Sequence, residues 1–284
     1  MTTIVSGSAS QALAAELADE LAEPLAAVTY DRFPDGELLA GVPGFDDDRA
    51  IVVASTVSSD AHLELLQLQD AVREAGATEV VTVLPYMGYG RQDEAFEPGH
   101  PGSARAVARA ISTGADRVLT VNPHEEAICD FFEPAATAID AADRLADPLP
   151  DDLADPVFLS PDAGATDLAE SVRDAYGDGE TDHFEKTRHS GTDVDITPSD
   201  VDVADRDVVV VDDIVATGST MSEAVGVLAA RGVGRTVVTC VHPLLVCEAA
   251  TKLRRAGVEA IYGTDTIERQ ASAVSVAPSI ASRL

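Results

Sequence analysis

Short runs of Val, Ile, Leu and Ala constrain the fold of this chain more than any other feature of its sequence. They alternate with Ala-, Leu- and Glu-rich stretches of helical period. Continuous apolar runs are typical of strands buried on both faces, and their alternation with helices favours a parallel sheet covered by helices. The expected strands are residues 51–54, 80–84, 118–121, 157–159, 208–211, 237–241 and 260–262. The expected helices are residues 9–22, 60–75, 102–113, 165–176, 219–231 and 246–256.

The two halves of the chain resemble each other. The apolar run that ends at Ala54 and the one that ends at Val211 lie 157 residues apart, and each follows an Asp-Arg pair. In both halves a loop, a helix, a glycine and a second Val-rich strand come next. This repetition predicts two duplicated α/β domains, residues 1–140 and 141–284, each a parallel sheet flanked by helices.

The charge of the chain narrows the choice of partners. The sequence has 19 Lys and Arg against 50 Asp and Glu, a formal net charge of −31 at pH 7. Such a charge opposes binding to DNA, RNA or an anionic membrane. Only two of the basic residues are lysines, Lys186 and Lys252. An acid excess with so few lysines predicts adaptation to a very salty cytoplasm, and Lys252, in the expected helix 246–256, is interpreted as a solvated surface charge.

The sequence contains no apolar run near the ~20 residues that a membrane-spanning helix requires. Its beginning has no basic region followed by an apolar stretch, so no secretory signal is expected. The three cysteines, Cys129, Cys240 and Cys247, are an odd number without metal-ligand spacing. We therefore expect neither a disulfide framework nor a zinc site, and a reducing, cytoplasmic location.

A buried strand runs into two carboxylates and a glycine turn in the second half of the chain. Asp212 and Asp213 follow the four valines, and the hydroxyl-rich segment 216–220 opens the next expected helix. Backbone N–H groups, hydroxyls and the positive helix end can form a cradle for phosphate. Two carboxylates repel phosphate, so they are expected to accept hydrogen bonds from a neighbouring cis-diol or to hold a cation.

A ribose 5-phosphate meets both demands of this segment. The alternatives for the segment taken alone are a strand followed by a capped helix, and the acidic pair of a response-regulator receiver. At the matching position the first half has Ser55 and Thr56 in place of the two carboxylates. The chemistry is therefore expected to reside in the second half.

Five further segments carry a resemblance to a known family. They are Phe33-Pro34-Asp35-Gly36-Glu37, Pro85-Tyr86-Met87-Gly88-Tyr89-Gly90-Arg91-Gln92-Asp93, Ser160-Pro161-Asp162-Ala163-Gly164, Glu185-Lys186-Thr187-Arg188 and Gly263-Thr264-Asp265-Thr266-Ile267. Together with the acidic loop, they resemble the ribose-phosphate pyrophosphokinases, in order and from Phe33 to the tail Ser275-Val276-Ala277-Pro278. The resemblance implies two phosphoribosyltransferase-type domains.

The resemblance also implies an activity and its partners. Members of this family use MgATP and ribose 5-phosphate to make 5-phosphoribosyl 1-diphosphate and AMP, and Mg²⁺ is the implied cofactor. The implied assembly is a homo-oligomer, a dimer or a multiple of dimers, with no nucleic acid and no membrane as partner. Two alternatives stay open: a phosphoribosyltransferase that consumes the product, and a catalytically silent regulatory homologue.

Site residues are implied in the same way. The resemblance assigns ATP binding to Phe33, Asp35, Gly36, Glu37, Arg91 and Gln92. It assigns ribose 5-phosphate binding to Arg188, Asp212, Asp213, Ala216, Thr217, Gly218, Ser219 and Thr220, and metal binding to His124 and Asp162. Lys186 and Arg188 are the expected catalytic residues, in a mobile polar loop between Tyr176 and Val208 that closes on the phosphates.

Overall fold

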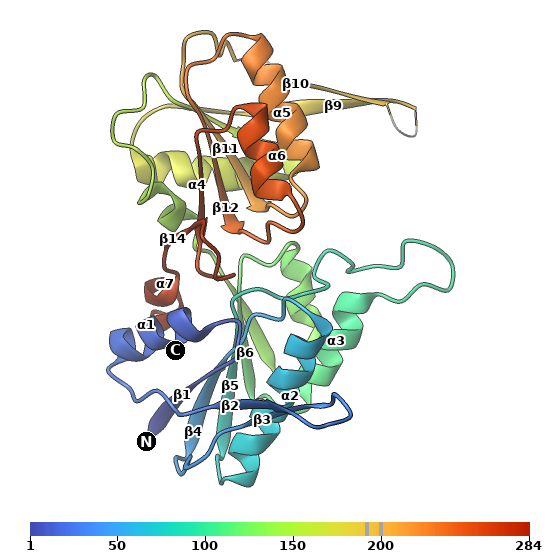
Figure 1. Cartoon of the computed structure of the whole chain (residues 1–284), viewed down its shortest axis with the longest axis vertical. Coiled ribbons are helices and arrows are strands. Elements are labelled where there is room, and N and C mark those ends of the chain that lie inside the picture. Colours follow the sequence, from blue (N-terminus) through green and yellow to red (C-terminus); the bar gives the residue numbers. More distant parts are fainter. Residues whose placement is uncertain (191–192, 199–200) are drawn as a thin grey trace. The chain divides into compact units, whose positions relative to one another are not determined.

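Parallel strands form the centre of two units in this computed structural model, which describes residues 1–190, 193–198 and 201–284, with the side chains of residues 1–185 and 201–284. Unit 1 comprises Met1–Asp140, Asp265–Glu268 and Ser275–Leu284, and unit 2 comprises Ala141–Thr264 and Arg269–Val274 (Figure 1). The expected boundaries put all of residues 141–284 in the second domain. The structure differs because two segments of the tail pack with unit 1.

Unit 1 is built on a five-stranded sheet in the order β1-β4-β5-β6-β7, with every neighbouring pair parallel. Its strands are β1 (Thr2–Ser6), β4 (Arg49–Val53), β5 (Glu79–Leu84), β6 (Arg117–Val121) and β7 (Ala135–Ile139). Its helices are α1 (Gln11–Leu21), α2 (Ser59–Glu74), α3 (Ser103–Ser112), α7 (Ala277–Ala281) and the 3₁₀ helix η1 (Glu126–Phe131). Strand valines such as Val52 and Val80 are fully buried with Leu65 and Leu68 of α2, because helices cover the parallel sheet.

An antiparallel hairpin of unit 1 stands apart from this sheet. It consists of β2 (Thr29–Arg32) and β3 (Leu38–Gly41), and β3 packs against α2. Its turn is residues 33–37, where the Phe33 N–H donates to the Glu37 carbonyl at 2.9 Å. Gly36 has φ 94°, which glycine adopts without steric cost.

Unit 2 has a seven-stranded sheet in the order β10-β9-β8-β11-β12-β13-β14. Its strands are β8 (Val157–Ser160), β9 (Glu180–Ser190), β10 (Asp193–Pro198), β11 (Val208–Ile214), β12 (Thr236–His242), β13 (Ala260–Thr264) and β14 (Ser272–Val274). Its helices are α4 (Thr166–Tyr176), α5 (Ser219–Ala230), α6 (Ala249–Ala256) and the 3₁₀ helices η2 (Ala142–Ala146) and η3 (Ala163–Ala165). The pairs are parallel except β9 with β10.

The expectation of a loop between Tyr176 and Val208 is wrong over much of its length. β9 pairs with β8 from Val157–Glu180 to Ser160–His183, and β10 folds back on β9 as an antiparallel partner. The segment reads as polar, but strand pairing uses main-chain groups and does not require apolar side chains. Phe184, 1% exposed, anchors β9 in the core of unit 2.

The two units repeat one architecture, as the sequence predicts. The strand order β1-β4-β5-β6-β7 of unit 1 corresponds to β8-β11-β12-β13-β14 of unit 2. In each unit the first strand is followed by a helix, an antiparallel hairpin and then the second parallel strand. The α/β fold with two duplicated, helix-flanked parallel sheets is therefore confirmed.

The tail residues that belong to unit 1 make specific contacts there. The Glu268 Oε1 atom accepts the N–H groups of Ala12 at 2.7 Å and Leu13 at 3.2 Å. Because the first N–H groups of a helix have no partner inside it, Glu268 caps α1. The Ser55 hydroxyl donates to the Thr266 carbonyl, and Ile267 is fully buried.

The cysteines do not crosslink this architecture. Cys129, Cys240 and Cys247 are free thiols. Burial, with the Asp212 carboxylate nearby, raises the pKa of the Cys240 thiol. None of the helices formed by the described residues combines the length and apolar character needed to cross a membrane.

Asp265 couples the stability of the fold to pH. Its carboxylate is 8% exposed and accepts the Val276 N–H at 2.9 Å. Burial raises its pKa from 3.8 to about 6, although hydrogen bonds from Ser275 and Val276 act in the opposite direction. The pKa of Asp265 is higher in the folded protein than in the unfolded chain, so the folded protein holds the proton more tightly. The free energy of unfolding therefore falls as pH rises from 3.8 to about 6, and above pH 6 this loss stays constant.

We therefore expect the free energy of unfolding of Asp265→Asn, relative to that of the wild type, to increase between pH 4 and pH 7. A pKa difference of about two units corresponds to at most ~3 kcal/mol. The amide oxygen can still accept the Val276 N–H, so this contact is retained. Urea titrations at constant KCl measure the difference, and a difference that does not change with pH would contradict the assignment.

Candidate active site

The acidic loop of unit 2 is held at the carboxyl end of β11. Val208–Val211 are fully buried, and β11 lies between β8 and β12. The structure extends the strand to Ile214, so that Asp212 pairs with Cys240 and Ile214 pairs with His242 of β12. In parallel α/β sheets the carboxyl ends of the strands are where ligands bind. The sheet therefore presents both carboxylates at its functional edge.

Three carboxyl groups gather at this edge. Burial raises the pKa of Asp212 well above its usual range, and the carboxyl groups of Asp213 and Asp162 raise it further. The Asp213 N–H donates to Asp212 Oδ1 at 3.0 Å. Asp162 precedes η3 as its N-cap, and its Oδ1 atom accepts the Gly164 N–H at 3.1 Å. A carboxyl group with a raised pKa keeps its proton to higher pH than usual, and a cation bound at this edge would oppose that rise by offsetting the repulsion among the three groups.

The loop after the carboxylates turns sharply into α5. Gly218 precedes the helix with φ 69°, a left-handed conformation that favours glycine. Thr217, Ser219 and Thr220 are exposed, whereas Gly218 is buried. The first N–H groups of α5 have no partner within the helix, so a ligand at this end meets N–H donors, hydroxyls and a positive helix dipole.

The segment that follows β12 holds residues 215 and 216 of the loop in place. The N–H groups of Leu245 and Val246 donate to the carbonyls of Val215 at 2.9 Å and Ala216 at 3.0 Å. This segment follows β12 and leads into α6. Its backbone is strained at Leu245, with φ 43°, a conformation that is an outlier for a bulky residue. Strain of this kind is typical of segments that position a functional site.

Ser55 and Thr56 of unit 1, which correspond to Asp212 and Asp213 of unit 2, have a structural role. The Thr56 N–H donates to the Tyr86 carbonyl at 2.9 Å, and the Thr56 hydroxyl accepts the Gly88 N–H at 2.9 Å. A Cβ at Gly88 would lie 2.1 Å from the Thr56 carbonyl oxygen, so only glycine fits. Thr56 thus holds the segment after β5, at the position where unit 2 has Asp213.

Two segments expected to bind ATP meet at the first turn of α2. Arg32, at the base of the hairpin turn, pairs with Asp60. The Tyr89 hydroxyl lies 3.4 Å from the Ser59 hydroxyl, and the Tyr89 ring lies 5.4 Å from the ring of His62. The structure therefore brings the turn that carries Phe33, Asp35, Gly36 and Glu37 and the segment that carries Arg91 and Gln92 to one end of one helix.

Arg91 and Gln92 lie in a tight turn that is tied to α3. The Gln92 N–H donates to the Tyr89 carbonyl at 2.9 Å, and the Gln92 carbonyl accepts the Ala104 N–H at 3.0 Å. Arg91 is exposed. The turn fixes the backbone, and the guanidinium is accessible to phosphate oxygens, for which it offers two parallel donors.

His124 is exposed in the loop after β6. Asn122 has φ 33°, and its amide donates to Asp140 at 2.8 Å. Its N–H also donates to the Ile139 carbonyl at 2.9 Å. These contacts pin the His124 loop to the end of β7. His124 belongs to unit 1, whereas the other expected metal residue, Asp162, belongs to unit 2.

Lys186 and Arg188 occupy β9, where their backbones pair with Ile196 and Val194 of β10. The side chains of residues 186–200 lie outside those that the structure describes. The assignment of Lys186 and Arg188 as catalytic residues therefore remains a prediction from the sequence.

Lys252 makes a contact that the sequence does not indicate. Its Nζ atom donates to the Ser219 hydroxyl at 3.0 Å, and the side chain is half-buried. Ser219 lies 33 residues earlier in the chain, so helical periodicity carries no information about this contact. The one feature of the sequence that could have drawn attention to Lys252 is composition, because lysine is so scarce in this chain.

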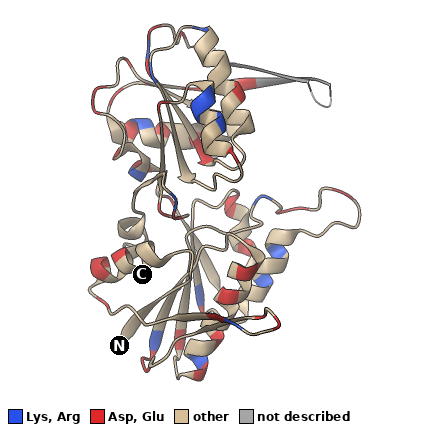
Figure 2. Ribbon diagram, in the orientation of Figure 1, with Lys and Arg blue, Asp and Glu red and all other residues tan. Residues whose placement is uncertain are grey.

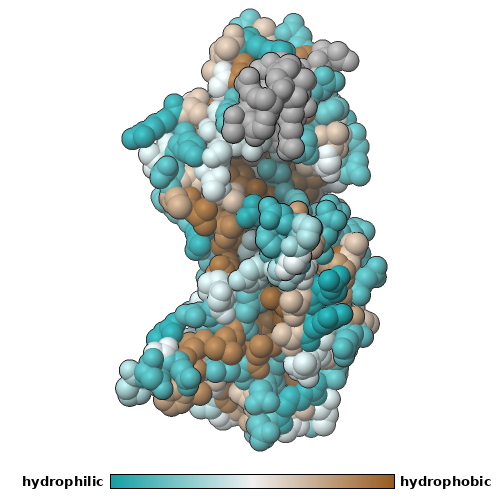
Figure 3. All heavy atoms as spheres, turned by 90° about the vertical axis from the view of Figure 1, so that its right-hand side faces the viewer, coloured by the Kyte–Doolittle hydropathy of each residue, from teal (hydrophilic) through white to brown (hydrophobic). Residues whose placement is uncertain are grey.

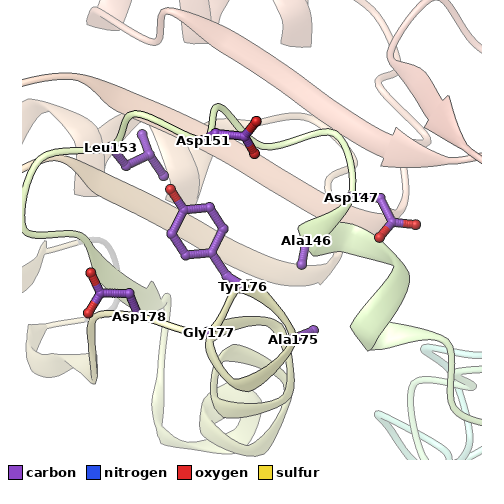
Figure 4. A pocket seen from close by; sticks show the side chains of 8 residues that line it. All are labelled: Ala146, Asp147, Asp151, Leu153, Ala175, Tyr176, Gly177 and Asp178. Carbon is purple, nitrogen blue, oxygen red and sulfur yellow. The ribbon is translucent and has the colours of Figure 1, made fainter.

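A hollow of about 450 Å³ in unit 2 lies away from these groups (Figure 4). It is lined by Ala146, Asp147, Asp151, Leu153, Ala175, Tyr176, Gly177 and Asp178. Tyr176 ends α4, which begins near the carboxyl end of β8, so the hollow is at the opposite edge of the sheet from Asp212. Its acidic lining opposes phosphate binding.

Comparisons with known proteins agree with this geometry. A family model described as the N-terminal domain of ribose phosphate pyrophosphokinase matches residues 2–114. A second model, described as a phosphoribosyl transferase domain, matches residues 136–277. Both matches confirm the predicted pair of phosphoribosyltransferase-type domains.

Curated relatives and a solved structure cover nearly the whole chain. A ribose-phosphate pyrophosphokinase of Halobacterium salinarum is 64% identical over 282 residues, 99% of this chain and 100% of its own length. One from Methanopyrus kandleri is 43% identical over 273 residues, 95% of this chain and 94% of its own. The crystal structure of phosphoribosylpyrophosphate synthetase from Mycobacterium smegmatis matches with a TM-score of 0.82 at 26% identity, over 99% of this chain and 97% of that one. This chain therefore belongs to the ribose-phosphate pyrophosphokinase family.

Proposed function

We propose that this enzyme transfers the diphosphoryl group of ATP to the anomeric hydroxyl of ribose 5-phosphate. The sugar oxygen forms a bond to the β-phosphorus, and the bond from that phosphorus to the oxygen of the α-phosphate breaks. The hydroxyl proton passes to solvent water, and the products are 5-phosphoribosyl 1-diphosphate and AMP. The observation that carries the proposal is the acidic pair and hydroxyl loop of unit 2, in a chain whose residues 2–114 match the N-terminal domain of these enzymes.

The loop of unit 2 is proposed to hold ribose 5-phosphate. Asp212 and Asp213 accept hydrogen bonds from the sugar diol, because the neighbouring carboxyl groups and burial make a hydroxyl donor favourable there. The phosphate lies against the start of α5, where the backbone and hydroxyls of residues 216–220 donate hydrogen bonds. Both parts of one ligand are thereby matched by adjacent parts of one loop.

ATP is proposed to bind unit 1. The Arg91 guanidinium pairs with phosphate oxygens, and Gln92 donates beside it. The hairpin turn supplies Phe33, which is 47% exposed, as an apolar surface for the adenine ring, with Asp35, Gly36 and Glu37 at its edge. The resemblance implies that the hairpin turn faces the adenine across a subunit contact, which is why a homo-oligomer is part of the proposal.

Magnesium fits the donor set, and His124 and Asp162 are the proposed protein neighbours of the ion. Carboxylate oxygens such as those of Asp162, Asp212 and Asp213 are hard ligands of the kind that Mg²⁺ prefers. Among the described residues no group of three or more His, Cys, Asp or Glu side chains forms a ready metal site. This is consistent with an ion carried mainly by substrate phosphates. Bound Mg²⁺ neutralises phosphate charge during transfer.

A homo-oligomer and a cytoplasmic location complete the proposal. The hairpin presents Phe33 and Leu39, which are 47% and 42% exposed, and brown hydrophobic atoms reach the surface in patches among hydrophilic ones (Figure 3). Exposed apolar side chains on one hairpin support contact with a second copy. Sedimentation in molar KCl, with a Leu39→Ser variant for comparison, measures the size of the assembly.

Formation of AMP from ribose 5-phosphate and MgATP in molar KCl tests the reaction. AMP with an equal amount of 5-phosphoribosyl 1-diphosphate supports the proposal. Release of diphosphate from 5-phosphoribosyl 1-diphosphate in the presence of a base, without AMP formation from ATP, would identify a phosphoribosyltransferase. No turnover in either assay, with both substrates bound, would indicate a silent homologue.

Asp212→Asn should lower kcat/KM for ribose 5-phosphate by at least ~10-fold, because the amide replaces one acceptor oxygen by an NH₂ group, and a sugar hydroxyl left without its acceptor costs about 1–3 kcal/mol. The amide keeps the volume, and its oxygen can still accept the Asp213 N–H. The KM for ATP should change little. Initial rates with each substrate varied in turn measure both effects.

Glu223→Gln is the matched control for this variant. Glu223 is an exposed carboxylate on α5, so the change removes one negative charge near the loop without touching it. The control should keep wild-type kinetics. Equal losses toward ATP and ribose 5-phosphate in Asp212→Asn would point to a collapsed site and against the assigned contact.

A further inference from the structure

Lys252 lies beside the loop that is proposed to bind the sugar phosphate. Its Nζ atom donates to Ser219 Oγ at 3.0 Å, and Ser219 is the first residue of α5. The Thr217 hydroxyl donates to the same oxygen at 3.3 Å. A serine hydroxyl has two acceptor positions and one proton to donate. With both acceptor positions occupied, the Ser219 proton is available only to a further acceptor.

The charge of the loop makes this arrangement significant. The segment from Val208 to Ala230 contains two aspartates and a glutamate but no Lys, Arg or His. The N-terminus of α5 supplies only about half of an elementary positive charge. A phosphate dianion next to Asp212 and Asp213 therefore needs cations from other elements. The sequence assigns Arg188 of β9 to this ligand, and Lys252 of α6 brings a second cation to the loop.

Packing sets the position of Lys252 relative to the loop. The next residue, Leu253, is fully buried in the core of unit 2. A Cβ built on Gly218 would lie 3.4 Å from the Leu253 Cγ atom and 3.4 Å from the Ala249 carbonyl oxygen, so the turn rests directly on α6. The Val246 N–H also donates to the Ala216 carbonyl at 3.0 Å. The helix and the loop thus hold each other in register.

We infer that Lys252 is a phosphate-positioning residue, which directs the Ser219 hydroxyl as a donor to the 5-phosphate of ribose 5-phosphate and offsets the negative charge of the loop. The inference rests on the proposed function, because it names a further residue of the same site. It assigns both lysines of the chain to the reaction: Lys186 to the transferring group and Lys252 to the anchoring phosphate.

The test compares Lys252→Met, Lys252→Arg and the control Arg254→Met. Methionine keeps the length of the side chain and the helix propensity but removes the charge and the donors. Arg254 lies two positions further along α6, on a different face, and its guanidinium contacts the Glu259 carbonyl. Its change removes the same charge from the same helix, so the control isolates the contact with Ser219 from the net charge of the protein.

We expect Lys252→Met to raise the KM for ribose 5-phosphate at least ~10-fold, with the KM for ATP, kcat and the melting temperature within about twofold or a few degrees of wild type. Lys252→Arg should recover most of the affinity, and Arg254→Met should match wild type. In a Ser219→Ala background, Lys252→Met should add little, because the two side chains act together. Unchanged affinity in Lys252→Met, or additive effects of the two substitutions, would overturn the inference.

Binding of ribose 5-phosphate without ATP, measured by calorimetry, separates this inference from the proposed reaction. Wild-type binding that weakens in Lys252→Met, together with no AMP formation by the wild type, would reject the reaction and retain the role of Lys252. Active wild type with equal binding in both proteins would reject the role of Lys252 alone.

Discussion

Lys186→Ala should lower turnover by at least ~100-fold while the affinities for ATP and ribose 5-phosphate and the melting temperature stay near wild type. Phosphoryl transfer depends on alignment and on neutralising charge that builds on the transferring group. A side chain that acts mainly in the transition state changes kcat more than it changes ground-state binding. The loss corresponds to about 3 kcal/mol of transition-state stabilisation.

The antiparallel pairing of β9 and β10 explains why folding should be spared. Lys186 pairs with Ile196 through main-chain groups, and an alanine retains that pairing. Single-turnover measurement of AMP formation separates the chemical step from binding. Arg231→Ala is the control: Arg231 is an exposed cation at the far end of α5 from the loop. Near-normal turnover in Lys186→Ala would transfer the neutralising role to Arg91 or to the metal.

Low salt should unfold this protein. The formal net charge is −31, and acidic residues are spread over helices and loops of both units (Figure 2). Their mutual repulsion opposes the compact state until cations screen it, over a Debye length of about 10 Å at 0.1 M and about 3 Å at 1 M salt. We expect the melting temperature to rise steeply between 0.1 M and 2 M KCl, with activity and circular dichroism both failing at the lower concentration.

A non-ionic solute provides the control for the salt experiment. Sucrose at the same osmolality favours compact states by exclusion from the protein surface but screens no charge. It should stabilise the protein much less than KCl does. A melting temperature that is the same at 0.1 M and 2 M KCl would show that the acidic surface is not an adaptation to salt.

The sequence predicts those strands and helices whose own residues form an apolar run or follow a helical period. The valine run of β12 and the period of α2 and α4 place these elements within one residue of their observed ends, and the valine run of β11 gives the correct start but ends three residues early. The sequence did not predict β1, β7, β14, the hairpin of β2 and β3, or the hairpin of β9 and β10. β2 is Thr-Tyr-Asp-Arg, and β9 is a mainly polar run. Such strands form because a neighbouring strand supplies main-chain hydrogen-bond partners. The sequence of a short or polar segment does not show which strand will pair with it.

The candidate site divides in the same way. Asp212, Asp213 and the segment 216–220 could be found because strand, carboxylates and glycine turn are contiguous. The contact between Lys252 and Ser219, and the meeting of the hairpin turn with Tyr89 at α2, join residues that are distant in the chain. These depend on how α6 and α2 pack, which no local period encodes.

The return of the tail to unit 1 bears on how this duplicated protein can be rearranged. The chain passes from one unit to the other after Asp140, Thr264, Glu268 and Val274. Neither unit is therefore one continuous stretch of sequence. A gene fragment that ends at residue 140 lacks Glu268, which caps α1, and Thr266, which accepts the Ser55 hydroxyl. The two units are thus interlaced along the sequence, so recombination that exchanged one half alone would separate Glu268 and Thr266 from their partners in unit 1.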